Sequence, residues 1–277
     1  MTLTDTHAHL YWPDFKQDFG EILQRAKDTG VTNLINVGVD VEKSKEALKQ
    51  VKEVSWPEGF LVRSTVGIHP HEAVNYINSN VSIHDDTANL EQLYLSAPES
   101  VVAIGECGLD FVEVDEQTKK LQTILFQAQI DLAKKLNLPL IVHCRDDRSK
   151  DPQNSEAWGK ILEMLGNYPT VLHCYSGLLP TTKYLIHNTN FYVSFAATLT
   201  YPRNDYLREA ARLLPIDRIV LETDSPFLPP QSKRGKRNEP ANIVETAKAL
   251  AEIKNLSLEE VANQTTKNAF VILNLKD

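Results

Sequence analysis

Two histidines stand one residue apart near the start of the chain, in the stretch LTDTHAHLYW. His7 and His9 directly follow a short apolar run that begins at Leu3. Side chains at positions i and i+2 of an extended segment point to the same side, so both imidazoles can face one point while Ala8 faces elsewhere. Imidazoles joined by carboxylates are ligands for divalent metals. Alone, the pair has two interpretations: half of a metal site, or two polar residues that begin a loop.

The same kinds of side chain recur after other apolar runs. Besides Asp5, His7 and His9, these positions hold His69, His71, Glu106, His143, Arg145, His173, Glu222 and Asp224. A single histidine at a strand end is more often a hydrogen-bonded loop residue than a ligand. Six of the eight histidines lie at these positions, however, and gathering them with carboxylates would bury unpaired charge unless a cation is bound. We therefore predict a metal site, with a ligand set that suits Zn, Mn, Co, Fe or Mg.

The three cysteines do not add thiolate ligands to this set. Cys107, Cys144 and Cys174 each directly follow a candidate ligand, so the alternation of a strand turns them away from it. We expect them to be packed thiols between strands and helices. Their odd number and spacing argue against a disulfide framework and fit a reducing compartment.

Eight short apolar runs would have to position the candidate ligands. The expected strands are Leu3 to Thr6, Asn33 to Val37, Leu61 to Gly67, Val101 to Gly105, Leu140 to His143, Thr170 to His173, Phe191 to Phe195 and Arg218 to Glu222. Helical patterns separate them, most clearly in EQTKKLQTILFQAQIDLAKKLNLP, where apolar residues including Ile124 recur at steps of three and four. Asn137, Leu138 and Pro139 should end that helix.

Apolar strands that alternate with helices predict a parallel sheet covered on both faces. With eight such units, we predict an α/β fold, a (β/α)8 TIM barrel in a single domain spanning residues 1–277. A doubly wound open sheet is the alternative. In a barrel the carboxyl ends of the strands meet at one mouth, where catalytic side chains lie. Two polar segments should be irregular: Asn75 to Asp86, as a loop or short helix, and Arg145 to Ser155.

Composition narrows the class of protein. The chain has 277 residues, of which 42% are hydrophobic and 24% charged, an ordinary globular composition. The net charge of −8 opposes a general attraction to nucleic acid. An anionic substrate would therefore be captured locally, by bound metal or by the basic run from Lys233 to Arg237. No run approaches the roughly 18 apolar residues of a membrane span, and no targeting segment is evident, so we expect a cytoplasmic protein without membrane contact. We also expect a monomer.

Six blocks together resemble the TatD family of metal-dependent deoxyribonucleases, within the amidohydrolase-like barrels. They are DTHAHL, GIHPHE, IGECGLD, IVHCR, LHCYSG and LETDSPFLPP with the later KRNEP, in consistent order from Asp5 to about Ile243. The resemblance implies two divalent ions side by side, Mg, Mn or Zn. The implied ligands are His7, His9 and Asp224 for the first ion, His143 and His173 for the second, and Glu106 as a bridge.

The resemblance also implies catalytic roles for Asp224 and Glu106. Asp224, beside the attacking water, would accept its proton as a general base. Asp5 would lie behind His7 and His9 and orient them. A bridging Glu106 distinguishes the chain from related barrels that carry a modified lysine on the fourth strand, where this sequence has no lysine.

Four residues are candidate contacts to the substrate. His69 is similar in position to a family histidine that contacts the substrate phosphate. Arg145 follows His143 by two and can give phosphate a forked contact, although an ion pair with Asp146 or Asp147 is the alternative. Arg237 and Asn238 follow the eighth strand, where the alternative is a solvated basic loop.

The function implied by the resemblance is hydrolysis of DNA, as a 3′–5′ exonuclease on single strands or 3′ ends. One alternative is a hydrolase of small amides, esters or cyclic phosphodiesters that uses the same metal centre. Another is a barrel that has lost catalysis and only binds a partner. Two departures from the family bear on the substrate: an acidic stretch, VEVDE, follows Phe111 where many relatives have a second aromatic residue, and the loop DDRSKDPQNSEAW is longer than usual.

Overall fold

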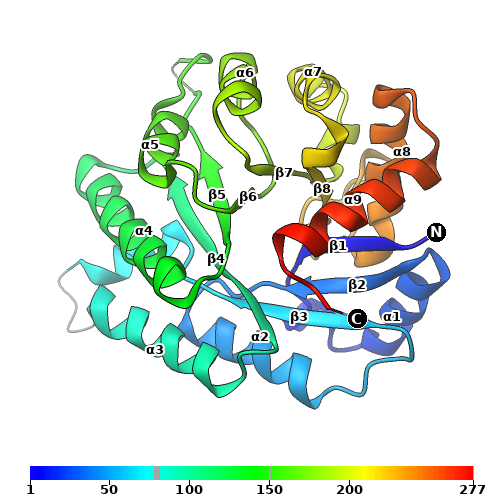
Figure 1. Ribbon diagram of the computed structural model, residues 1–277, viewed down its shortest axis with the longest axis horizontal. Helices are drawn as coiled ribbons and strands as arrows, with labels where there is room; N and C mark the ends of the chain where they lie inside the picture. The colour runs from blue at the N-terminus through cyan, green and yellow to red at the C-terminus, as the bar shows by residue number, and fades with distance from the viewer. Residues whose placement is uncertain (78–81, 150, 277) are drawn as a thin grey trace.

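The computed structural model describes residues 1–77, 82–149 and 151–276. Eight parallel strands form one sheet in the order of the chain, and helices surround it (Figure 1). The strands are β1 (Leu3–Ala8), β2 (Val31–Asn36), β3 (Leu61–Val66), β4 (Val101–Asp110), β5 (Leu140–Arg145), β6 (Thr170–Leu172), β7 (Tyr192–Phe195) and β8 (Ile219–Leu221).

Helices follow the strands around the outside. Within the described ranges they are α1 (Phe19–Asp28), α2 (Val41–Glu53), α3 (Ile83–Ser96), α4 (Glu116–Leu136), α5 (Glu156–Leu165), α6 (Leu179–Asn188), α7 (Asp205–Leu213), α8 (Ile243–Lys254) and α9 (Leu258–Ile272). Short 3-10 helices are η1 (Pro13–Phe15), η2 (Pro70–Tyr76), η3 (Ala197–Thr200), η4 (Ile216–Arg218), η5 (Gln231–Lys233) and η6 (Pro240–Asn242). None of the helices in the described part of the chain is long and apolar enough to span a membrane.

The first and last strands meet at the end of the barrel that carries the candidate ligands. Ala8 and Ser225 form a parallel bridge. The N–H of His9 donates to the carbonyl of Ser225 at 2.8 Å, and the N–H of Asp224 donates to the carbonyl of His7 at 2.9 Å. The prediction of a TIM barrel in a single domain is confirmed, and the open-sheet alternative is wrong.

Two apolar clusters hold the barrel together. The larger one joins the outer faces of the strands to the helices, with Trp158, Phe126 and Phe191 among its largest buried side chains. The smaller one brings together β-strand residues such as Val102, Ile141 and Val220 with Leu273, next to the end of α9. Because both faces of the sheet are buried, polar side chains within the strands, such as Asp5, Asn36 and Ser64, are buried and hydrogen-bonded.

Two sequence predictions differ from the structure. Strand β4 continues to Asp110 rather than ending at Gly105, because its pairing with β5 resumes after a register shift between Ile104 and Cys107. Glu106 lies within this shift, a type of irregularity that re-aims a side chain. In α4, which ends at the left-handed Asn137 as predicted, Ile124 is 56% exposed, because the apolar stripe is wider than the face that meets the barrel.

The two segments expected to be irregular are partly described. Asn75 and Tyr76 lie in η2, residues 83–86 begin the longer helix α3 after the capping residue Ser82, and residues 78–81 lie outside the described part. Arg145, predicted to begin the second irregular segment, is the last residue of β5. Residues 146–149 and 151–155 contain neither helix nor strand, as predicted, and residue 150 lies outside the described part.

Candidate metal centre

Polar side chains from several strand ends surround one cavity at the carboxyl end of the barrel. The cavity has a volume of about 610 Å³. Its lining includes His9, His69, His71, Glu106, His143, Arg145, His173 and Asp224, together with Trp12 and Phe227. His7 is fully buried against this group. The structure therefore brings all six predicted metal ligands together.

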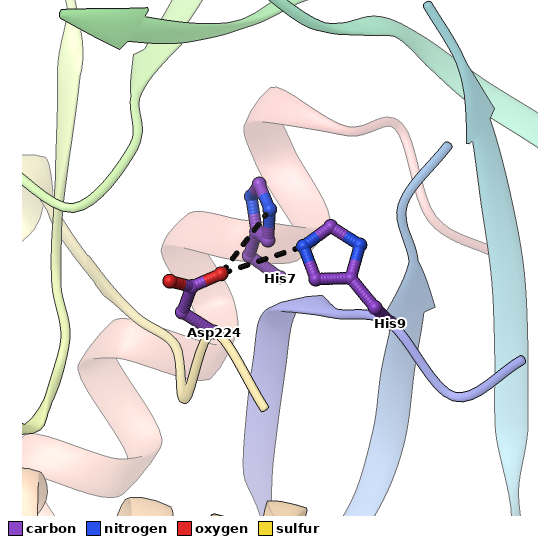
Figure 2. Close-up of side chains that lie close together, drawn as sticks. All are labelled: His7, His9 and Asp224. Carbon is purple, nitrogen blue, oxygen red and sulfur yellow. Dashed lines mark ion pairs between the residues drawn. The ribbon is translucent and has the colours of Figure 1, made fainter. Parts of the chain in front are cut away.

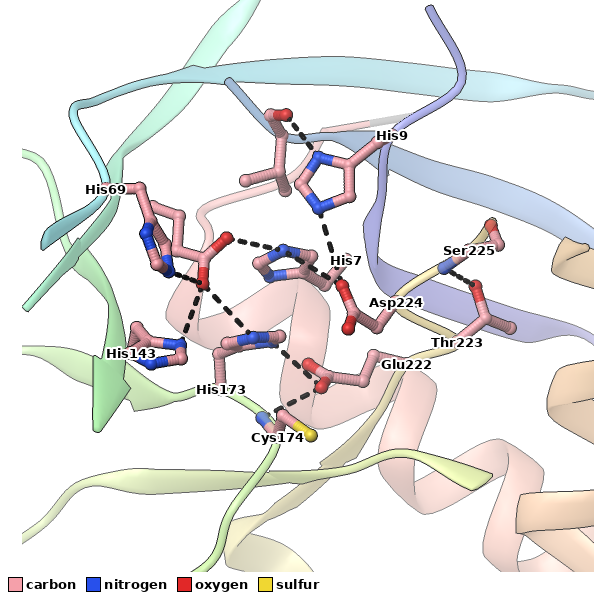
Figure 3. A network of polar contacts seen from close by, with 12 residues as sticks. His7, His9, His69, His143, His173, Cys174, Glu222, Thr223, Asp224 and Ser225 are labelled. Carbon is pink, nitrogen blue, oxygen red and sulfur yellow. Dashed lines mark hydrogen bonds and ion pairs between the residues drawn. The ribbon is translucent and has the colours of Figure 1, made fainter. Parts of the chain in front are cut away.

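Glu106 lies between two groups of imidazoles, and the surrounding histidines are labelled in Figure 3. Its Oε2 lies 3.2 Å from Nε2 of His7, and its Oε1 lies 3.4 Å from Nε2 of His69, 3.1 Å from Nδ1 of His143 and 3.3 Å from Nε2 of His173. Burial acts to raise the pKa of Glu106, but the surrounding histidines outweigh it and hold the pKa well below its ordinary value. The carboxylate is therefore ionised, with each oxygen directed to a different group.

His7, His9 and Asp224 form the first group (Figure 2). Oδ1 of Asp224 lies 3.8 Å from Nε2 of His7 and 3.4 Å from Nε2 of His9. Nδ1 of His9 is 2.9 Å from the carbonyl oxygen of Val37. Since a carbonyl only accepts, Nδ1 carries the hydrogen and Nε2 presents its lone pair to the group. The two rings lie 5.0 Å apart and face the same side, as the spacing predicts.

His143 has a carboxylate partner on the side away from Glu106. Its Nε2 lies 3.0 Å from Oδ2 of Asp110, so Nδ1 is left to face Glu106. The same Asp110 oxygen lies 3.0 Å from Nε2 of His71, and the second oxygen accepts the N–H of Val112. Carboxylates that hold a ligating imidazole from behind in this way fix its tautomer and strengthen its binding to metal.

Glu222 does the same for His173. Its Oε1 lies 2.9 Å from Nδ1 of His173 and accepts the N–H of Cys174 at 2.8 Å, and its side chain is fully buried. Sequence reasoning assigned no role to Asp110 or Glu222. The available signal was that each acidic residue stands at the end of an otherwise apolar run, in GLD and LETD.

The donor set fits divalent cations. Both ring nitrogens of His7 are buried without a hydrogen-bond partner in the described structure. Burial lowers the pKa of His7, so its ring is neutral and offers a lone pair. A buried polar group without a partner costs about 1–3 kcal/mol, which a bound cation would offset. Among the described residues, three groups of side chains have ligand atoms within 4.8 Å of one another: His7, His9 and Asp224; His69, Glu106 and His143; and His7, His173 and Glu222.

His69, predicted to contact the substrate phosphate, lies next to the candidate ligand Glu106. Its hydrogen bonds determine which ring nitrogen carries the hydrogen. Its Nδ1 accepts the N–H of His71 at 3.1 Å. The neutral ring must then carry its hydrogen on Nε2, the atom that lies 3.4 Å from Glu106. Burial lowers the pKa of His69 to about 4. This side chain is therefore arranged as a hydrogen-bond donor into the cavity rather than as a ligand.

The segment that carries Asp224 is clamped by buried polar residues. Asp5 accepts two hydrogen bonds from Thr223, and burial raises the pKa of Asp5 to about 7. Asn238 is also fully buried; its side chain donates to the carbonyls of Thr223 and Leu228. Asn238 does not belong to the cavity lining. Its geometry therefore speaks against the predicted substrate contact and assigns it the positioning of this loop.

The two predicted arginines differ in position. Arg145 lines the cavity with a side chain that is 58% exposed, and its guanidinium lies 3.9 Å from Oδ2 of Asp110. Arg237 is directed elsewhere: its guanidinium makes a forked contact with Asp18 and lies over the ring of Phe15. Because both arms of Arg237 are engaged outside the cavity, the structure does not support its predicted contact with substrate.

The cysteine prediction is correct for Cys107, whereas Cys144 and Cys174 both line the cavity. Cys107 and Cys144 are buried, and burial raises the pKa of each well above its ordinary value. Cys174 is only half-buried and lines the cavity, because its backbone turns at φ 42° directly after β6. Phe111 is buried beneath Lys119 and does not line the cavity.

Comparisons with known proteins identify the family of this chain. A model described as TatD related DNase matches residues 4–274. The chain is 35% identical over 272 residues to the uncharacterized metal-dependent hydrolase YabD of Bacillus subtilis strain 168, covering 96% of this chain and 97% of the relative. It is 31% identical over 278 residues to the 3′-5′ ssDNA/RNA exonuclease TatD of Erwinia tasmaniensis, covering 98% and 99%. A crystal structure of a TatD homologue from Escherichia coli K12 matches with a TM-score of 0.82 and 25% identity over 99% of this chain and 98% of that one. The chain therefore belongs to the TatD-related DNase family and is a metal-dependent hydrolase.

Proposed function

We propose that this protein is a 3′–5′ exonuclease that hydrolyses phosphodiester bonds of single-stranded DNA with two divalent cations. His7, His9 and Asp224 would hold one cation, and His143 and His173 the other, with Glu106 between them. The proposal depends on the position of the Glu106 carboxylate: one oxygen faces His7, and the other faces His143 and His173. A single cation would leave one of these groups without a partner.

Two adjacent cations lower the pKa of a bound water and neutralise charge on the phosphate oxygens. The carboxylate of Asp224 lines the cavity and would accept the proton of the attacking water as a general base. Burial acts to raise the pKa of Asp224, but the surrounding histidines outweigh it and hold the pKa below its ordinary value.

The cavity wall supplies donors for the substrate phosphate. His69 lines the cavity, and its Nε2–H, which lies 3.4 Å from Oε1 of Glu106, would donate to a non-bridging oxygen of a bound phosphate. The exposed guanidinium of Arg145 can make a forked contact with a phosphate at the mouth. The choice of single-stranded DNA as substrate also draws on the name of the Erwinia relative, a 3′-5′ ssDNA/RNA exonuclease.

The test is degradation of single-stranded DNA labelled at its 5′ end, assayed separately with Mg, Mn and Zn. The wild-type protein should release nucleotides stepwise from the 3′ end. Glu106→Gln and Asp224→Asn should each reduce the rate by about 100-fold or more, since these residues would ligate metal directly and loss of an outer partner alone costs 10- to 100-fold. Lys45→Ala, on an exposed face of α2, is the matched control and should retain the wild-type rate.

Full activity of Glu106→Gln would overturn the proposed metal centre. Internal cleavage of circular single strands would overturn the exonuclease assignment. A parallel panel of small amides, esters and cyclic phosphodiesters covers the alternative substrate class: strong turnover of an amide without DNA cleavage would contradict a nuclease.

A further inference from the structure

A second cavity lies beside the metal centre and shares a wall with it. It has a volume of about 620 Å³ and lies between α2 and the segment that follows β1. Trp12 lines both this cavity and the metal cavity. Its lining also includes Tyr11, Phe19, Lys16, Lys43 and Lys49. We call this cavity the Trp12 groove.

Two aromatic rings lie where the metal cavity adjoins the Trp12 groove. Trp12 and Phe227 lie edge to face, with ring centroids 5.5 Å apart, and each lies about 6 Å from the ring of His9. Phe227 is 44% exposed although it is a large apolar side chain. Exposed aromatic rings beside a phosphate-binding site are suited to stacking on nucleobases.

Lysines lie along the groove beyond Trp12. The ammonium of Lys43 is 6.0 Å from the centre of the Trp12 ring and 5.9 Å from that of Tyr11. Lys43 and Lys49 each have a glutamate nearby, Glu46 at 2.9 Å and Glu53 at 3.8 Å. Lys16 is exposed and makes no ion pair with the described residues. The groove thus has three lysines against two glutamates, in a chain whose net charge is −8.

We propose that the Trp12 groove holds the part of a DNA single strand that lies 5′ of the scissile phosphate. A base would stack on Trp12 and Phe227, and the next phosphates would contact Lys16, Lys43 and Lys49. This inference rests on the proposed function: in an exonuclease acting at the 3′ end, one arm of the substrate continues beyond the metal cavity. The Trp12 groove adjoins that cavity and combines rings with cations, as single-strand sites do.

The experiment compares two substrates in the full-length protein with Mn: a single-stranded DNA 12-mer, and the small diester bis(4-nitrophenyl) phosphate, which cannot reach the groove. The triple variant Lys16→Ala, Lys43→Ala, Lys49→Ala should raise KM for the 12-mer at least 10-fold more than KM for the diester. The slope of log KM for the 12-mer against log salt concentration should decrease by about 2 in the triple variant. Each phosphate contact on a single strand contributes about 0.7 to this slope, and three contacts would be lost.

Trp12→Ala tests the stacking step, and Trp12→Phe should restore most of the affinity because it retains a ring. In wild-type protein, KM should also fall as the substrate lengthens from a dinucleotide to a tetranucleotide, since only the longer strand reaches the groove. Lys45→Ala is the control on the same helix, because Lys45 does not line the groove and pairs with Glu42. Circular dichroism and melting of each variant identify any that fail to fold.

The outcomes separate this inference from the proposed function. If the wild-type protein cleaves the diester but not single-stranded DNA, the proposed substrate is wrong. A second outcome is that the wild-type protein cleaves DNA but the folded triple variant and folded Trp12→Ala behave like wild type. If both keep the wild-type ratio of KM for the 12-mer to KM for the diester, and the wild-type salt dependence, the Trp12 groove does not bind the strand and the inference is overturned.

Discussion

The buried carboxylate of Asp5 accepts two hydrogen bonds from Thr223, one from its backbone N–H at 2.9 Å and one from its hydroxyl at 2.6 Å. These bonds join β1, which carries His7, to the loop that carries Asp224. The sequence predicts that Asp5 orients the histidines. The observed contacts are to main-chain groups of both segments, because Asp5 also accepts the N–H of His7 at 3.2 Å.

Asp5→Ala should therefore weaken both the fold and the metal centre. Two donors of Thr223 would be buried without an acceptor, a loss of about 2–4 kcal/mol in the free energy of unfolding, and the dissociation constant for Mn should rise about 10-fold. Urea unfolding and calorimetric titration with Mn measure the two effects. Asp28→Ala, at an exposed aspartate of α1 bonded to Gln24, should change neither. Unaltered Mn affinity in Asp5→Ala would show that Asp224 is positioned by other contacts.

The carboxylates behind His143 and His173 should control metal affinity without taking part in the reaction. Asp110→Asn and Glu222→Gln should each raise the Mn concentration needed for half-maximal activity by about 10- to 100-fold. The maximal rate at saturating Mn should change much less. Activity measured against Mn concentration separates these effects, with Asp131→Asn on the exposed face of α4 as the control. A large loss of maximal rate that Mn does not restore would contradict a purely positioning role.

Metal should stabilise the folded chain through the same cluster. At a Mn concentration 100 times the dissociation constant, the free energy of unfolding should increase by about 2.7 kcal/mol, and chelation should reverse the increase. Thermal melting with and without Mn measures this. His143→Ala should remove most of the shift, whereas Lys45→Ala should keep it. An equal shift in wild type and His143→Ala would place the metal elsewhere.

The ion pair of Asp18 predicts a pH-dependent contribution to stability. The hydrogen bond from Arg237, with that from Arg25, lowers the pKa of Asp18 to about 2 from 3.8. Because the folded state favours the ionised form, the contribution is complete well above pH 4 and is lost as the pH falls from about 4 to 2. Asp18→Asn should therefore be less stable than wild type at pH 7, by about 0.5–1 kcal/mol.

Denaturant unfolding of Asp18→Asn and wild type between pH 7 and pH 2.5 checks the sign, since the difference should shrink toward the acid end. Asp28→Asn serves as the comparison at an exposed aspartate of α1. A difference that grows on acidification would contradict the stated direction.

Much of the barrel could be predicted because it depends on local patterns. Apolar runs and the helical periodicity of α4 follow from burial on one or both faces of an element. The alternation of a strand was sufficient to place His7 and His9 on one side. The predicted end of β4 at Gly105 was wrong, because the strand resumes its pairing with β5 after a register shift and so includes Glu106. An irregularity of pairing has no fixed residue pattern.

The sequence by itself determined the eight-unit barrel and the residue types gathered at its mouth. This is because the carboxyl ends of all the strands in a parallel barrel lie at one mouth, whatever the paths of the loops. Only the tertiary structure decided which groups stand behind the ligands. The pairings of His143 with Asp110 and His173 with Glu222, the forked contact of Arg237 with Asp18, and the approach of Trp12 to Phe227 join distant segments. Such contacts depend on the register between strands and the paths of loops, which spacing along one segment does not encode.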